Sequence, residues 1–193
     1  MTIKTRTANS LLIPLFAAAM VFGSTSARAH LLFRAAADKP AEGWRTNMWG
    51  KREDGTTGTA KITTTTGPEG GGALQVTVKD SPGCSAISPD FEDGAWRHKK
   101  YKAVEVTYRG DGSPNHISFY LSGKAADGKT SARARFSLGL REKGWKTVVL
   151  HPAKPKGGKP SLELCNAKNM YFGCRGTVSF TIAWVRLLTA DDL

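Results

Sequence analysis

The chain has 193 residues, 40% of them hydrophobic, and a formal net charge of +12. This length suits one domain with a sizeable core. After residue 22, no apolar stretch approaches the roughly 20 residues that a membrane-spanning helix needs, which excludes a protein with such a helix there.

The first 29 residues have the three parts of a secretory signal peptide. Two basic residues precede an apolar run of twelve residues at 11–22, and Ala27 and Ala29 are the small residues that a signal peptidase reads. No cysteine follows the apolar run, so no lipid anchor is expected. We therefore expect cleavage between Ala29 and His30 and a secreted or periplasmic protein.

Cleavage would remove three basic residues, Lys4, Arg6 and Arg28, and no acidic residue, but the remaining chain would still be basic. The processed chain of 164 residues would carry 25 basic and 16 acidic residues, a net charge of +9. Outside the cytoplasm, a basic surface suits acidic polysaccharide, an anionic cell envelope or nucleic acid, and it also serves solubility alone. We expect a polysaccharide partner, no nucleic acid and a monomer.

Short alternating runs of apolar and polar residues dominate the processed chain, and glycine, proline and aspartate separate them. This spacing predicts an all-β fold, a β-sandwich of two antiparallel sheets. One helical turn is expected at 161–168, and residues 30–43 are interpreted as a lead-in to a single domain at 44–190. The expected strands are 59–65, 73–80, 84–91, 102–110, 116–123, 132–138, 145–151, 169–176 and 178–188.

Three pieces of sequence occur in a recognisable order. ALQVTVKDSPGCSAISPDF comes first, YKAVEVTYRGDG and HISFYLSG follow, and GWKTVVLHP and TVSFTIAWVRLL come last. They resemble the galactose-binding-domain-like jelly roll of many carbohydrate-binding modules and of complex I intermediate-associated proteins. The resemblance covers residues 44–188 and implies a jelly-roll sandwich with a sugar cleft on one concave sheet. In such modules an acidic residue of the final strand can help to hold a structural calcium, and FTIAWVRLL lacks that residue. We therefore expect no cofactor and no metal site, with a structural calcium left open as an alternative.

Strand alternation places four candidate ligand contacts on one sheet surface. His116 and Tyr120 share a face of HISFYLSG, and Arg133 and Arg135 share a face of SARARFSL. An Asp-Gly dipeptide between the two strands suits a tight turn, so a hairpin should bring the four side chains together. Tyrosine offers a platform to a sugar ring, and arginine pairs geometrically with a carboxylate or sulfate.

Three further residues complete the candidate ligand-binding set. Glu105 and Arg109 point outward from a neighbouring strand, and Trp96 lies in AWRHKKYK, where basic and aromatic residues interleave in a way that suits a polyanion. The alternative is an ordinary solvated face with a basic connection before the next strand. The RGD tripeptide at 109–111 falls on a strand-end turn, so no adhesion role is expected.

The three cysteines allow at most one disulfide within a monomer, and export makes that bond feasible. Cys165 and Cys174 are close in sequence and are the first expectation, while the sequence leaves Cys84 with either of them open.

Taken together, the residues predict a secreted, non-enzymatic protein that binds acidic or cell-envelope polysaccharide. The main alternative is a polysaccharide-active enzyme on the same fold. It would be a hydrolase with paired carboxylates, or a lyase in which Tyr120 or His116 abstracts a proton while Arg133 or Arg135 neutralises a uronate. A lesser alternative is a copper protein in which the free amine and imidazole of His30 chelate the metal with a second histidine.

Overall fold

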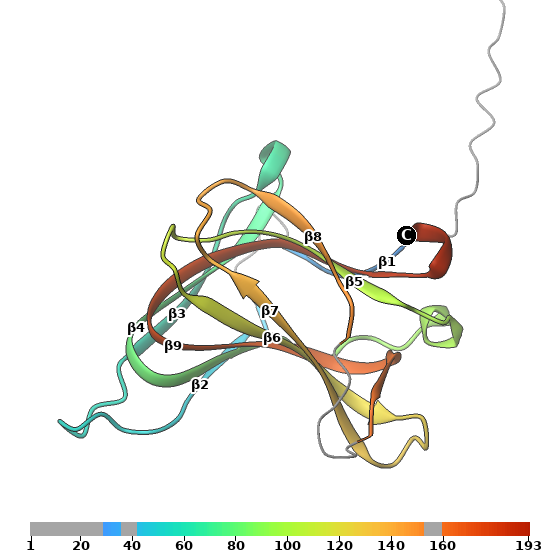
Figure 1. The fold of residues 1–193 in the computed structure, drawn as a ribbon, viewed down its shortest axis with the longest axis horizontal. Helices are drawn as coiled ribbons and strands as arrows, with labels where there is room; N and C mark the ends of the chain where they lie inside the picture. The colour runs from blue at the N-terminus through green and yellow to red at the C-terminus, as the bar shows by residue number, and fades with distance from the viewer. Residues whose placement is uncertain (1–28, 36–41, 153–159) are drawn as a thin grey trace, which may run out of the picture.

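Two antiparallel sheets lie face to face in the computed structural model, which describes residues 29–35, 42–152 and 160–193 (Figure 1). The all-β sandwich that the sequence predicts is confirmed. Its strands are β1 (His30–Arg34), β2 (Arg45–Met48), β3 (Thr59–Thr66), β4 (Gly72–Ile87), β5 (Ala103–Arg109), β6 (His116–Ala125), β7 (Ser131–Gly139), β8 (Lys146–Leu150) and β9 (Leu162–Leu188). Short 3-10 helices are η1 (Pro68–Gly70), η2 (Ala95–His98) and η3 (Ala190–Asp192).

The first sheet, named here the β5 sheet, contains β3, the first half of β4, the second half of β9, β5 and β8, in that order. β1 pairs with the last part of β9, beyond the point where the pairing of β9 with β4 ends. His30 lies opposite Leu187, and Arg34 lies opposite Trp184. Residues 30–34 of the expected lead-in are therefore a strand of the sandwich.

The second sheet, named here the β6 sheet, contains β2, the end of β4, the first half of β9, β6 and β7. β6 and β7 form the hairpin that the Asp-Gly dipeptide predicts. The Asp127 carboxylate accepts hydrogen bonds of 2.8 Å from the backbone N–H groups of Lys129 and Thr130, and Gly128 takes a positive φ of 66°. This turn fixes the register of the two strands, as hairpin turns generally do.

β4 and β9 belong to both sheets, because each bends from one layer into the other (Figure 1). The pairing of β4 with β9 shifts register between Val78 and Cys84. Asp80 and Gly176, on facing sides of this bend, have positive φ values of 53° and 74°. Glycine adopts such a conformation without the steric penalty of a side chain, which suits Gly176 to the bend. Runs that the sequence separates into 73–80 and 84–91, and into 169–176 and 178–188, therefore join into two long strands.

The core lies between the sheets and is filled by alternate residues of their strands. In β7 the exposure alternates residue by residue, with Phe136 buried and Arg135 exposed. Phe119 stacks on Phe136 with ring centres 5.3 Å apart and on Phe172 with ring centres 5.1 Å apart. This ladder of rings joins β7, β6 and β9 and holds the inner face of the β6 sheet, so the opposite face is left for solvent and ligands.

The expected helical turn is wrong. Residues 161–168 were expected to hold a helical turn, but β9 begins at Leu162 and pairs with β6 through Leu162 and Ala167. Leu, Glu and Ala favour helix in isolation, and pairing with β6 overrides that weak preference. Residues 1–28 of the expected signal peptide lie outside the described residues. Within the described ranges, the structure contains no helix that is long and apolar enough to cross a bilayer.

The first expectation for a disulfide is also wrong, because Cys165 and Cys174 both lie on β9. The pairing of β9 with β6 sets Ala167 opposite Gly123 and Gly173 opposite Ser118, and five residues of β6 strand span about 17 Å. A disulfide requires Cα atoms within about 7 Å of each other, so these two cysteines cannot be joined within one chain.

Candidate functional site

A groove of about 930 Å³ runs across the outer face of the β6 sheet. Strands β2, β4, β9, β6 and β7 all contribute to it, because every second side chain of each strand points to this face. The structure brings together four of the sequence-predicted residues here, namely His116, Tyr120, Arg133 and Arg135. The other lining residues are Asn47, Trp49, Ser85, Ile87, Asn115, Ser118, Tyr171, Gly173 and Arg175, and Cys174 also borders the groove although its side chain belongs to the buried core.

Two tyrosines form the centre of the groove. Tyr120 of β6 lies directly opposite Tyr171 of β9 in the antiparallel register. Their rings stack with centres 4.5 Å apart and planes 10° from parallel. Burial raises the pKa of the Tyr171 phenol above its ordinary value, and the nearby Arg133 offsets part of that rise. At neutral pH Tyr171 therefore offers a neutral hydroxyl group, and both tyrosines offer ring edges to a ligand.

Two arginines flank the tyrosine pair from β7. The guanidinium of Arg133 lies 5.7 Å from the ring centre of Tyr171, and that of Arg135 lies 5.8 Å from the ring centre of Tyr120. Arg135 also donates a hydrogen bond of 3.1 Å to the hydroxyl of Ser118. These contacts orient the guanidinium groups without neutralising them.

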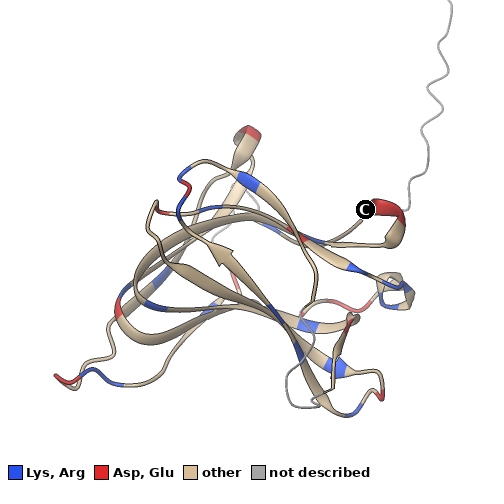
Figure 2. Cartoon of the chain, viewed as in Figure 1, with Lys and Arg blue, Asp and Glu red and all other residues tan. Residues whose placement is uncertain are grey.

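The charge of the groove has one sign. Its lining includes three arginines, Arg133, Arg135 and Arg175, and no aspartate or glutamate. Among the described residues, no carboxylate lies within ion-pair distance of any of the three. Elsewhere on the fold, Lys and Arg occur on both sheets and in the loops, and most Asp and Glu lie in loops and 3-10 turns (Figure 2). The groove is thus a place where cations gather without acidic partners.

Trp49 lies at the β2 end of the groove and is 40% exposed. Its backbone N–H donates to the carbonyl oxygen of Gly83 at 2.9 Å, and its indole packs over the same residue. A Cβ atom at position 83 would lie 2.1 Å from the indole nitrogen, so only glycine leaves room for the ring in this position. An exposed indole held in place this way is a suitable surface for stacking against a sugar ring.

The sequence analysis did not select Tyr171 or Arg175 as ligand contacts. Tyr171, Gly173 and Arg175 are two residues apart in NMYFGCRG, so strand alternation predicts that they share one face of the sheet. Alternation alone does not say whether that face is the groove or the core, because this depends on the pairing of β9 with β6.

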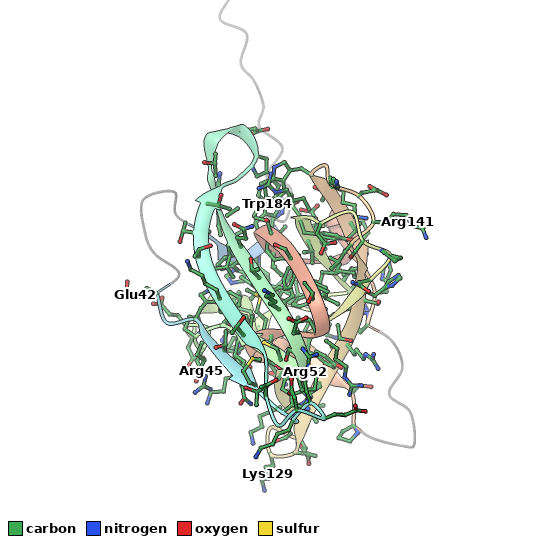
Figure 3. All side chains as sticks on the ribbon, turned by 90° about the vertical axis from the view of Figure 1, so that its left-hand side faces the viewer. Glu42, Arg45, Arg52, Lys129, Arg141 and Trp184 are labelled. Atoms are coloured by element: carbon green, nitrogen blue, oxygen red, sulfur yellow. The ribbon has the colours of Figure 1, made fainter. Side chains whose placement is uncertain are left out.

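Glu105 and Arg109 are not brought to the groove. Both lie on β5, and Glu105 faces the outer side of the β5 sheet, where its carboxylate accepts hydrogen bonds from Arg186 Nε at 2.7 Å and Trp184 Nε1 at 3.3 Å. Arg109 lies over the ring of Trp145, 5.1 Å from its centre. Figure 3 labels Trp184 in the upper half of the view and Arg45 in the lower half; Trp184 pairs with β5 in the β5 sheet, whereas Arg45 belongs to β2 of the β6 sheet.

Trp96 is not at the groove either. It is only 7% exposed, and it lines a separate pocket of about 380 Å³ beside β1. Its ring stacks on the imidazole of His30 at 4.8 Å, and its indole N–H donates to the carbonyl oxygen of Glu92 at 3.1 Å. The neighbouring Arg97 donates to the carbonyl oxygen of Ala167 at 2.9 Å, so the segment is anchored to β9.

The surroundings of His30 bear on the copper alternative. Burial against Trp96 lowers the pKa of the His30 imidazole, and the positive charges of Lys99 and Arg97 lower it further. The same two cations would repel a metal cation at this imidazole. Within the described parts of the chain, no three His, Cys, Asp or Glu side chains gather in an arrangement that could hold a metal ion.

The fold and groove can be set beside known proteins. No family model matches the chain, and no curated protein sequence matches it. Three solved structures of similar fold are informative.

A family 11 carbohydrate-binding module from Clostridium thermocellum, in complex with a β-1,3-1,4-mixed-linked tetrasaccharide, is 16% identical. The match covers 84% of this chain and 96% of that one with a TM-score of 0.61. A family 30 carbohydrate-binding module of a cellulosomal cellulase from the same organism is 12% identical, over 85% and 99% of the two chains, with a TM-score of 0.56. An exo-β-agarase is 12% identical over 83% of this chain and 25% of its own, with a TM-score of 0.57. The protein therefore has the jelly-roll fold that carbohydrate-binding modules share, and the resemblance to the complex I domain stays a prediction.

Proposed function

We propose that this protein is an exported, non-enzymatic carbohydrate-binding protein whose groove on the β6 sheet takes an anionic polysaccharide. The observation that carries the proposal is the groove lining, which combines Tyr120, Tyr171 and Trp49 with three arginines and no carboxylate. The likeness of the fold to carbohydrate-binding modules supports it.

Each class of side chain in the groove matches one feature of such a ligand. The guanidinium groups of Arg133 and Arg135 can each pair in a bidentate way with a uronate carboxylate or a sulfate ester. Asn47, Asn115 and Ser118 supply amide and hydroxyl groups for ring hydroxyls. One face of each tyrosine ring is covered by the other ring, so the exposed Trp49 indole at the end of the groove is the site for stacking.

The direct test is binding of the processed chain, residues 30–193, to a panel of soluble polysaccharides. The panel should include alginate, polygalacturonate and a sulfated galactan as anionic ligands, with a mixed-linkage β-glucan as the neutral ligand. Titration calorimetry should show binding to at least one anionic chain and weaker binding to the neutral one. Binding to the neutral glucan alone would overturn the anionic preference while leaving carbohydrate binding intact.

A lyase on the same groove is the second candidate, because His116 and Tyr120 line the groove beside Arg133 and Arg135. Such an enzyme would abstract a proton from a uronate that an arginine neutralises. It would leave an unsaturated uronate that absorbs ultraviolet light. Incubation with alginate, polygalacturonate and glycosaminoglycans distinguishes the two candidates, since the binding protein should produce no rise in absorbance.

A further inference from the structure

Cys84 and Cys174 lie directly opposite each other on adjacent antiparallel strands. The register pairs Cys84 of β4 with Cys174 of β9, beside the bend that carries both strands from one sheet to the other. Both side chains belong to the buried core, with exposed fractions of 0% and 4%. Residues directly opposite in such a pair point to the same face of the sheet, so the two thiols meet inside the sandwich.

The two cysteines are free thiols in the structure, and the geometry of an opposed strand pair suits a disulfide between them. Opposed residues of an antiparallel pair have Cα atoms about 4.5–5.5 Å apart, and disulfides join Cα atoms about 4.4–6.8 Å apart. The Sγ atom of Cys174 lies 3.8 Å from the carbonyl oxygen of Cys84, so its side chain already leans toward the partner residue. We propose that Cys84 and Cys174 form a disulfide in the exported protein, across β4 and β9.

The third cysteine is left as a free thiol. Cys165 is half-buried on β9, and its Sγ contacts the Glu163 carboxylate at 4.0 Å and the Asn166 side-chain oxygen at 3.8 Å. It is nine residues along the same extended strand from Cys174, out of reach of a bond with it. It is also far along the β9 strand from the point where Cys84 is paired.

The bond is expected to form as the chain folds, because both cysteines are buried in the folded protein and an oxidant does not reach them there. The hydrogen bond between the two thiols raises the pKa of Cys174 and lowers that of Cys84. Oxidation removes two protons and two electrons from the thiols. A disulfide donor, either a thiol–disulfide oxidoreductase or oxidised glutathione, accepts them and becomes two thiols. This step rests on the expected export to an oxidising compartment, but it does not depend on carbohydrate binding.

The position of the bond relates it to the groove. The next opposed pair along the two strands is Ser85 and Gly173, and both of these residues line the groove. A bond at Cys84 and Cys174 would therefore lock the pairing of β4 with β9 at the groove wall. It would also close a loop of 90 residues, and long closed loops are where a cross-link restricts the unfolded chain most.

The experiment counts free thiols in the full chain after export to a disulfide-forming periplasm. The purified protein is unfolded in guanidinium without reductant and alkylated, and its intact mass is measured by mass spectrometry. One alkylated cysteine is expected, and peptide mapping should place it at Cys165 and recover the peptides of Cys84 and Cys174 joined. Cys165→Ser should give no alkylation, and Cys84→Ser should give two alkylated cysteines. Reduction of the wild type should lower its Tm by about 5–15 °C, as expected for the loss of one disulfide from a domain of this size.

Refolding in a glutathione redox buffer repeats the test independently of the host. Three alkylated cysteines from both preparations would overturn the proposal, and so would a bond that includes Cys165. A bond found in a protein that binds no polysaccharide would leave this inference standing and remove the proposed function.

Discussion

Tyr120 and Tyr171 stack face to face across two neighbouring strands, with ring centres 4.5 Å apart. The stack exists because the antiparallel register of β6 and β9 sets these residues directly opposite each other. Phe119 and Phe172, the preceding and following residues of the same two strands, are also paired and stack on the inner face. One register therefore builds an aromatic ladder in the core and an aromatic pair in the groove.

Removing one ring of the pair should weaken ligand binding. Tyr171→Ala deletes an aromatic contact and leaves Tyr120 free to rotate, so the affinity for an anionic polysaccharide should fall about 5–10-fold, or roughly 1–1.5 kcal/mol. Tyr171→Phe keeps the ring and loses only the hydroxyl, so its loss of affinity should be smaller, about two- to threefold. Titration calorimetry measures both, and urea unfolding checks that each variant is folded. Equal losses for the two variants would show that the hydroxyl, and not the stack, matters.

The two arginines of β7 should contribute to affinity and hardly at all to stability. Arg133→Ala and Arg135→Ala should each cost about 1–3 kcal/mol of binding free energy, the range for a lost charge-assisted hydrogen bond. Their free energies of unfolding should change by less than about 0.5 kcal/mol, because both side chains are exposed. Binding of the wild type should also weaken as NaCl is added, since salt screens exposed charges.

Lys61→Ala is the matched control, because Lys61 is an exposed cation on β3, in the β5 sheet. It removes one positive charge without touching the groove and should leave the affinity unchanged. If it weakens binding as much as Arg133→Ala does, net charge rather than the groove attracts the ligand. Large losses of stability with intact affinity in the arginine variants would show that the face is structural.

Glu105 should matter for folding and not for ligand binding. Its carboxylate is mostly buried on the outer face of the β5 sheet and bonds to Arg186 and Trp184. Glu105→Gln replaces the ion pair with a neutral hydrogen bond and should cost about 1 kcal/mol of unfolding free energy, since Arg186 is partly exposed and screened. Polysaccharide affinity should be the same as that of the wild type by calorimetry. A loss of affinity without a loss of stability would return Glu105 to the ligand-binding set.

The sequence predicted the sandwich because alternation of apolar and polar residues is a local signal. The hairpin of β6 and β7 could be inferred with its face assignment, since Asp127 and Gly128 fix the turn and Arg135 and Phe136 alternate around it. Trp96 shows the limit of such reasoning. Its neighbours in sequence are basic, which favoured a polyanion contact, but its ring packs on His30, and that contact depends on the placement of β1.

The rest of the groove depends on pairings between residues far apart in the chain. Tyr171 reaches Tyr120 only through the pairing of β9 with β6, and Cys174 reaches Cys84 only through the pairing of β9 with β4. No local pattern states which strands are neighbours. For the same reason the lack of a carboxylate in the groove, the main evidence on ligand charge, could not be read from the composition, which includes 16 acidic residues.

The RGD tripeptide ends in an aspartate that should stabilise the fold in a pH-dependent way. The Asp111 carboxylate accepts hydrogen bonds of 2.9 Å from the backbone N–H groups of Ser113 and Ser179, which tie the loop after β5 to β9. Partial burial raises the pKa of Asp111, but the hydrogen bonds from Ser113 and Ser179 outweigh it, and the pKa lies below its ordinary value of 3.8.

A carboxyl group whose pKa is lower in the folded state stabilises the fold above its unfolded pKa and loses that effect as pH falls through the folded value. Asp111→Asn should therefore lower the free energy of unfolding at neutral pH, because an amide cannot accept both backbone bonds. The difference in free energy of unfolding between variant and wild type should decrease as the pH drops below 3.8 toward the folded pKa, where the wild-type carboxyl becomes protonated and loses its charge. Urea unfolding at neutral and acidic pH measures this difference.

Asp191→Asn, at an exposed position in η3, is the control and should leave the free energy of unfolding at neutral pH nearly unchanged. A difference of constant size between Asp111→Asn and the wild type across this range would mean that Asp111 acts through the shape of its loop rather than through its charge.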